Sequence, residues 1–215
     1  MTTYKVVNSD KLDADLKSVA DAIRSKTKNS GSLAFPRDYV SAMEGVFGAD
    51  TLVDRSITEI SSPAEHVGQF ALHSCSKLKS VNLPNATYID NSAFKLCTSL
   101  TSVVFPKVNR IDPSAFAECT SLQTADFQCA SGWGIYPSAF SGCAKLTALI
   151  LRTTARVHPL SNKNAFTGTP IASGTGYIYV PNTKLEAYKS ATNWSVYAAQ
   201  FRAIEAYPDI TGGTV

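Results

Sequence analysis

The same spacing of apolar residues recurs four times between residues 67 and 152 of this 215-residue chain. Each copy begins with Ile or Val and has Ala at the fourth position after it, Phe or Leu at the fifth, Cys at the eighth and Leu at the eleventh. The copies are VGQFALHSCSKLKSVNLP (67–84), IDNSAFKLCTSLTSVVFP (89–106), IDPSAFAECTSLQTADFQ (111–128) and IYPSAFSGCAKLTALILR (135–152). A fixed period of this length indicates stacked supersecondary units rather than one globular hydrophobic pattern.

Each copy is expected to form one coil of a solenoid. In the second copy, Val103 and Phe105 point to one face of a strand and Val104 points away, because side chains alternate along a strand. Pro106 ends the strand, since proline has no N–H to donate to a ladder. One coil cannot enclose a core, so the copies should stack at the strand spacing of about 4.8 Å. Stacking aligns a ladder of cysteines and a ladder of Leu72, Phe94, Phe116 and Phe140.

The motif SAFxxCxxLxxVxFP resembles the BspA-like leucine-rich repeat family. The residues that carry the resemblance are Ala93, Phe94, Cys97, Leu100, Val103, Phe105 and Pro106, with their equivalents in the other copies. The resemblance covers about residues 57–181. It implies a short BspA-like solenoid of about five β-coils that binds a protein or glycan without catalysis, on a cell surface or a virion.

Three segments are predicted: an N-terminal element (1–50), the solenoid (51–181) and a C-terminal cap and tail (182–215). Apolar residues at helical spacing from Leu12 to Ile23, and again from Tyr39 to Val46 or Phe47, predict an N-terminal helical hairpin. This hairpin is expected either to cap the first coil or to attach the chain to partners, including further copies of itself. The stretch also resembles the start of prophage-encoded tail-associated proteins, which implies a tail accessory.

The C-terminal part of the chain is expected to close the solenoid. A distorted fifth copy is predicted to begin at Val157, with a strand at Tyr177–Val180 near its end. Behind it, the spacing from Leu185 to Ala191 suits a short helix, and Trp194 and Tyr197 are expected to plug the open end of the core in a mixed α/β cap. The final DITGGTV is expected to be mobile.

Composition excludes several partners. The chain has 20 basic and 17 acidic residues, a net charge of +3 and no run of five like charges, so we expect no nucleic-acid binding. No segment approaches the roughly 18 apolar residues that span a bilayer, and the N-terminus lacks the apolar core of a signal peptide. We expect a soluble chain, associated with a virion or, if a leader precedes this stretch, with a cell surface.

No pattern of chemistry-bearing residues predicts an enzyme, a metal site or a cofactor. The three histidines are scattered, and GxSxG, HExxH and phosphate-loop motifs are absent. The five cysteines do not have zinc-ligand spacing. Because four of them share one repeat position, we expect Cys75, Cys97, Cys119 and Cys143 to be buried free thiols, with Cys129 the more accessible.

The positions on either side of the first residue of each copy are expected to line up on the surface. This register places Arg110 and Arg156 on either side of Gly134, which leaves a gap, with Trp133 before the gap and Tyr136 after it. An aromatic floor between two guanidinium groups suits a sugar or a carboxylate-bearing partner. The remaining flanking residues of the same copies are Tyr88, Asp90, Asp112 and His158.

Two alternatives stay open. The ligand could instead bind the outward face of the long strands, at Asn82, Val104, Asp126 and Ile150. The chain could also be a structural component, in which the N-terminal helices assemble copies and the repeats act as a spacer.

Overall fold

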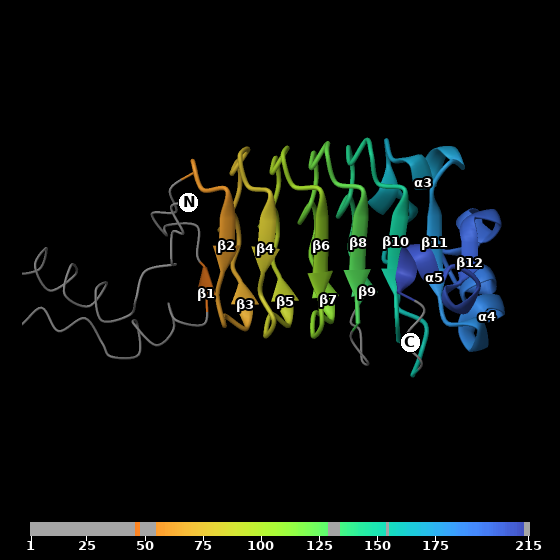
Figure 1. The fold of residues 1–215 in the computed structure, drawn as a ribbon. Coiled ribbons are helices and arrows are strands. Elements are labelled where there is room, and N and C mark those ends of the chain that lie inside the picture. The colour runs from red at the N-terminus through yellow and green to blue at the C-terminus, as the bar shows by residue number, and fades with distance from the viewer. Residues whose placement is uncertain (1–45, 48–54, 129–133, 154, 213–215) are drawn as a thin grey trace, which may run out of the picture.

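The computed structural model describes residues 46–47, 55–128, 134–153 and 155–212. The chain winds into stacked coils with a long strand on one side and a short strand on the other (Figure 1). The long strands are β2 (Glu59–Ser61), β4 (Ser80–Asn82), β6 (Ser102–Phe105), β8 (Thr124–Phe127), β10 (Ala148–Leu151) and β11 (Tyr177–Val180). The short strands are β1 (Val46–Phe47), β3 (His66–Val67), β5 (Tyr88–Ile89), β7 (Arg110–Ile111) and β9 (Gly134–Ile135).

Equivalent residues of successive copies pair with one another in parallel. One sheet has the order β1-β3-β5-β7-β9, and β2 pairs with β4. A further sheet has the order β12-β11-β10-β8-β6, in which β12 (Phe201–Ala203) is an edge strand. Ile89 pairs with Ile111, and Val104 pairs with Asp126. Since the repeat period in the sequence becomes the register of the sheets, the prediction of stacked parallel coils is confirmed.

Two left-handed turns in each coil connect the strands. They lie three and seven residues after the first residue of each copy, and φ is positive at Phe70, Ser74, Ser92, Leu96, Ser114, Glu118, Ser138 and Gly142. Backbone hydrogen bonds between neighbouring coils hold these turns, as in the bonds from Ser92 N–H to Pro113 O and from Ser114 N–H to Pro137 O, both 3.1 Å. The turn geometry therefore depends on the backbone rather than on the side chain.

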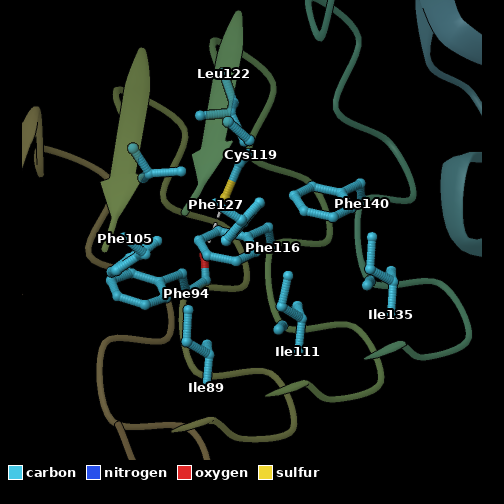
Figure 2. Close-up of a cluster of buried hydrophobic side chains, with 14 of the residues drawn as sticks. Ile89, Phe94, Phe105, Ile111, Phe116, Cys119, Leu122, Phe127, Ile135 and Phe140 are labelled. Atoms are coloured by element: carbon cyan, nitrogen blue, oxygen red, sulfur yellow. Dashed lines mark hydrogen bonds between the residues drawn. The ribbon is translucent and has the colours of Figure 1, made fainter. Parts of the chain in front are cut away.

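The core consists of aromatic ladders that run along the stack (Figure 2). The rings of Phe94 and Phe116 are parallel with centroids 5.0 Å apart, and Phe140 continues the ladder 5.3 Å from Phe116. Phe166 extends it by one coil, at 5.7 Å from Phe140. These rings and Leu72 are fully buried, which confirms the predicted ladder.

The four repeat cysteines are buried free thiols, as predicted. Each of the later three donates its S–H to a carbonyl of the preceding coil: Cys97 to Leu72, Cys119 to Phe94 and Cys143 to Phe116, each at 3.1 Å. Burial raises the pKa of Cys119 well above its ordinary value, and its cysteine neighbours in the adjacent coils add to this effect. Cys129 lies outside the described residues.

These thiols are expected to resist a maleimide reagent in the native protein, because the reactive thiolate is disfavoured in apolar surroundings. Mass spectrometry after a short native exposure should find Cys97 and Cys119 unmodified, whereas the same exposure in denaturant should label both. Rapid native labelling of Cys119 would contradict its burial.

The N-terminal prediction needs one correction. Val46–Phe47 was expected to end the second helix, but it forms strand β1 and pairs with β3 through Val46–His66 and Phe47–Val67. Alternating β-branched and aromatic residues also suit an edge strand, and that backbone pairing outweighs the helical spacing here. The rest of the predicted helical hairpin lies outside the described residues.

The opposite end of the core is closed as predicted. Trp194 is fully buried and Tyr197 nearly so, and their rings lie 5.9 and 5.5 Å from Phe166. The closing elements are η1 (Lys163–Phe166), α3 (Pro170–Ser173), η2 (Asn182–Lys184), α4 (Leu185–Ser190) and η3 (Ser195–Gln200). The short helix expected between Leu185 and Ala191 is α4.

The segment that follows turns back over the outward face of the long strands (Figure 1). β12 (Phe201–Ala203) first pairs with β11 at the edge of the sheet, and η4 (Ile204–Ala206) and α5 (Pro208–Thr211) then lie over the outward face. Ile204 joins Ala148, Ile150 and Tyr179 in a second apolar cluster. The expectation of a mobile tail is therefore wrong for Asp209–Thr211, because Thr211 is buried and its hydroxyl donates to Ile204 O.

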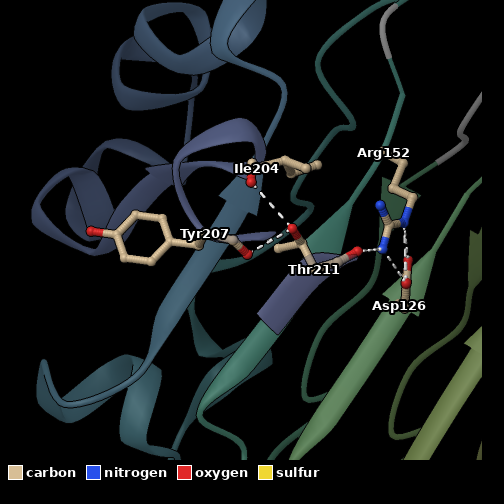
Figure 3. A network of polar contacts seen from close by, with 5 residues as sticks. All are labelled: Asp126, Arg152, Ile204, Tyr207 and Thr211. Carbon is tan, nitrogen blue, oxygen red and sulfur yellow. Dashed lines mark hydrogen bonds and ion pairs between the residues drawn. The ribbon is translucent and has the colours of Figure 1, made fainter. Parts of the chain in front are cut away.

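The segment over the long strands also changes the exposure of the outward-facing residues on these strands. Asn82 and Val104 are exposed as expected, but Asp126 and Ile150 are buried. The Arg152 guanidinium pairs with the Asp126 carboxylate through Nε–Oδ1 (2.9 Å) and Nη2–Oδ2 (2.8 Å) and donates to Thr211 O (Figure 3). The alternative binding face is thus reduced to its N-terminal half.

Candidate functional site

The short strands and the residues directly after them carry a row of polar and aromatic side chains, which we call the short-strand strip. Its partly exposed members are His66, Tyr88, Asp90, Arg110 and Tyr136, and its buried member is Asp112. Parallel pairing aligns His66 with Tyr88 and Tyr88 with Arg110, so that neighbouring members belong to neighbouring coils. The strip therefore presents its side chains from a fixed backbone.

Arg110 is the centre of the strip. Its Nε and Nη2 donate to Asp112 Oδ1 and Oδ2 at 2.6 and 3.1 Å, and its guanidinium carbon lies over the Tyr136 ring, 5.2 Å from the centroid. The hydrogen bond to Asp112 raises the pKa of Arg110, although partial burial opposes this. The arrangement joins a cation, an anion and an aromatic ring from two coils, and it brings together Arg110 and Tyr136, two of the predicted site residues.

The other end of the strip contains a second such group. His66 Nε2 lies 2.8 Å from Asp90 Oδ1, an ion pair when the imidazole is protonated. The His66 ring meets the Tyr88 ring edge to face, with centroids 5.8 Å apart. Sequence reasoning missed His66, although it directly precedes Val67 and so occupies the same repeat position as Tyr88 and Arg110.

The predicted pairing of two arginines across Gly134 is wrong. In the next coil Leu160, not Val157, pairs with Ile135, so Pro159 rather than Arg156 lies beside Gly134. Gly134 leaves no gap, because a Cβ at this position would lie 2.4 Å from Pro159 O. The predicted register of this copy was wrong because its extra residues lie before Leu160, the residue that pairs with Ile135, rather than after it. Trp133 lies outside the described residues.

The shift in register also moves His158 from the surface into the molecule. His158 is 4% exposed, its backbone N–H donates to Tyr188 Oη at 3.0 Å, and its carbonyl accepts from Trp194 Nε1 at 2.6 Å. Burial, assisted by the charge of Arg156, lowers the pKa of His158 to about 4. It is thus part of the cap rather than of the strip.

This burial predicts a pH dependence of stability. The folded-state pKa of His158 is about 4 and its ordinary value is 6.5, so between these values the unfolded chain takes up the proton more readily. Neutral His158 therefore has no effect on the pH dependence well above pH 6.5, and the free energy of unfolding falls by about 3 kcal/mol as the pH decreases from 6.5 towards 4. Urea titrations of wild type and His158→Gln over this range should show a shallower pH dependence in the variant. Parallel curves would contradict the assignment.

One pocket among the described residues is small. It is lined by residues that include Asn109, Gly134 and His158 and has a volume of about 10 Å³, the space that one water molecule needs. No group of three or more metal-binding side chains occurs in the described residues. Among the same residues, no helix combines the length and apolar character required to cross a bilayer.

Comparison with known protein families identifies the type of repeat. The BspA type leucine-rich repeat region matches residues 65–191 in six copies, which is more than half of the chain. Together with the stacked parallel coils, this match defines a leucine-rich repeat protein. The chain belongs to the BspA-type leucine-rich repeat family.

Solved structures with a similar arrangement include two leucine-rich repeat proteins, each 24% identical. The T. pallidum protein aligns with a TM-score of 0.47 over 59% of this chain and 57% of its own, and the Bacteroides ovatus ATCC 8483 protein with a TM-score of 0.35 over 60% and 44%. This chain thus spans less than two thirds of either relative. No protein of curated function matches it. None of these comparisons supports the resemblance of the N-terminal stretch to prophage tail-associated proteins.

Proposed function

We propose that the chain is a non-catalytic binding module that recognises a protein partner through the short-strand strip. Leucine-rich repeats generally mediate protein binding, which supports this class of function. The observation that carries the proposal is the group of Arg110, Asp112 and Tyr136, with contacts of 2.6, 3.1 and 5.2 Å. Because these side chains already hold one another in place, a partner would lose little binding energy in ordering them.

The residue types of the strip also fit this role. Tyrosine and arginine dominate the binding energy of protein interfaces, and Tyr88, Arg110 and Tyr136 are partly exposed on adjacent coils. Arg110 uses two of its five N–H donors on Asp112, so further donors can meet a carbonyl or a carboxylate. The guanidinium covers one face of the Tyr136 ring. A sugar would need an open ring face for stacking, so the contact favours a protein over a glycan.

The proposal extends to a location on a cell surface, where BspA-like repeats often occur. Fluorescence microscopy of the tagged chain in the cell that encodes it tests the proposed location separately. A location on a virion, which the resemblance of the N-terminal stretch implied, has no such support.

The binding role is tested by screening the purified chain against protein and glycan arrays and measuring each hit by surface plasmon resonance. Arg110→Ala/Tyr136→Ala should weaken a protein hit by about tenfold or more, with unchanged thermal unfolding. Lys145→Ala, which removes an exposed charge far from the strip, is the matched control. Equal affinity of the double variant would reject the strip, and a chain that binds nothing but forms multimers would favour the structural spacer.

A further inference from the structure

One exposed side chain departs from the pattern of the coils. Phe70 lies three residues after Val67, where the next three coils have Ser92, Ser114 and Ser138. All four residues have left-handed backbones, with φ of 59°, 56°, 58° and 58°. A bulky residue is unusual in this region, where side chains of L-residues come too close to the backbone. Phe70 therefore occupies a position that the other coils fill with a small residue.

The fold does not require an aromatic ring at this position. The turn is held by the bond from Phe70 N–H to Asn91 O at 3.1 Å, and Ser92 and Ser114 make the equivalent bonds at the same length. The Phe70 side chain is 40% exposed and does not belong to the core. A strained backbone position that holds a large, exposed apolar side chain indicates a functional role rather than a structural one.

The surroundings of Phe70 are basic. Its ring lies edge to face with the His73 ring, with centroids 5.7 Å apart, and His73 Nδ1 is 2.8 Å from Ser74 Oγ. Ser74 N–H donates to Lys95 O at 2.8 Å, which places Lys95 in the coil directly beside His73 and Ser74. The pKa of His73 is lowered by burial and, to a smaller extent, by the charges of Arg55 and Lys95. Arg55 is exposed and Lys95 is partly exposed. An apolar side chain thus lies beside two accessible cations.

We propose that Phe70, Arg55 and Lys95 form a docking point for an acidic segment of a protein partner. An apolar side chain of that segment would pack on Phe70, and its carboxylates would face the two cations. The charges argue for an acidic partner because like charges would repel a basic one. The docking point adjoins the short-strand strip, since Phe70 bonds to Asn91, the residue after Asp90. The inference rests on the proposed function, which it deepens by naming the chemistry of the partner.

The first test separates a binding role from a structural one. Phe70→Ser gives the first coil the residue of the next three, so its urea midpoint should be equal to or above that of wild type. A clear fall in the midpoint would show that Phe70 stabilises the fold and would overturn the proposal. Val196→Ser, which removes another exposed apolar side chain, in the C-terminal cap, is the control for altered surface hydrophobicity.

The second test measures binding directly. The probe is a fluorescein-labelled peptide with a central tryptophan between pairs of glutamates, followed by fluorescence anisotropy at low salt. We expect saturable binding by wild type and by Val196→Ser, a loss of about tenfold or more in Phe70→Ser, and a several-fold loss in Arg55→Gln/Lys95→Gln. A peptide with lysine in place of glutamate should not bind. Equal binding of both peptides, or equal affinity of wild type and Phe70→Ser, would overturn the proposal.

Two further outcomes separate this inference from the proposed function. If Phe70→Ser leaves an array-identified protein partner bound while Arg110→Ala/Tyr136→Ala releases it, the docking point is wrong and the strip stands. If an anionic polysaccharide such as heparin displaces the peptide and no protein binds the array, the site recognises a glycan, and the peptide proposal fails together with the protein partner.

Discussion

Phe116→Ala is expected to lower the free energy of unfolding by about 3–5 kcal/mol, the range for a large-to-small change at a buried aromatic. The ring is fully buried and stacks between Phe94 at 5.0 Å and Phe140 at 5.3 Å, and it also touches Phe105. Backbone bonds hold neighbouring coils at a fixed spacing, so the cavity cannot close. Since domains are stable by about 5–15 kcal/mol in total, urea titration should show a large shift of the midpoint.

Asn82→Ala is the control for this prediction. Asn82 is exposed and its amide donates to Ser61 Oγ at 3.0 Å, a surface bond between neighbouring strands. We expect a change within about 0.5 kcal/mol, as for most surface substitutions. Equal shifts for Phe116→Ala and Asn82→Ala would mean that the assignment of inward and outward faces is wrong.

The repeat itself was predictable because each coil obeys the same local physics. Alternation placed Val103 and Phe105 inward, proline ended the strands, and the fixed period then determined which residues pair. The same reasoning gave the wrong register for the fifth coil. Val157 has the right residue type, but Leu160 takes the short-strand position, and only backbone pairing distinguishes the two. The error displaced Arg156 and His158 together, because the register of a coil moves all of its side chains.

The outward row of the long strands could not be read from the repeat alone. A repeat predicts what lies beside a residue within the stack, whereas the cover over Asp126 and Ile150 comes from residues 204–211, which lie far outside the repeat in the sequence. One signal was present. The last two outward residues of the row, Ile150 and Tyr179, are large and apolar and pair with each other, and adjacent large apolar side chains on an outward face indicate that something covers them.

The candidate site was only partly predictable, for a related reason. The register of the four regular copies predicted that Arg110 and Tyr136 lie on neighbouring coils, and the structure places their side chains in contact. Phe70 was overlooked because reasoning from the repeat concentrates on the shared positions, and Phe70 is a departure from one. A bulky residue where other copies have serine is nevertheless visible in the sequence, and the left-handed backbone explains its significance.

Arg152→Ala is expected to destabilise the protein by about 3–5 kcal/mol, the cost of leaving a buried charge without its partner. The side chains of Arg152 and Asp126 are 10% and 9% exposed, so water cannot replace the lost contact. The substitution also removes the hydrogen bond to Thr211 O, which ties the C-terminal segment to the strands. Limited proteolysis should therefore cleave near Tyr207 faster in the variant, and urea titration gives the loss of stability.

The double variant Asp126→Val/Arg152→Ala separates the cost of an unpaired buried charge from the cost of the lost side-chain packing. Valine is the residue at the paired position, Val104, and it removes the buried carboxylate along with the need for a cation. We expect the double variant to be more stable than Arg152→Ala alone, because replacing a whole buried ion pair with apolar groups is often nearly neutral. If Arg152→Ala costs less than about 1 kcal/mol, as for an exposed ion pair, the guanidinium does not hold the C-terminal segment against the strands.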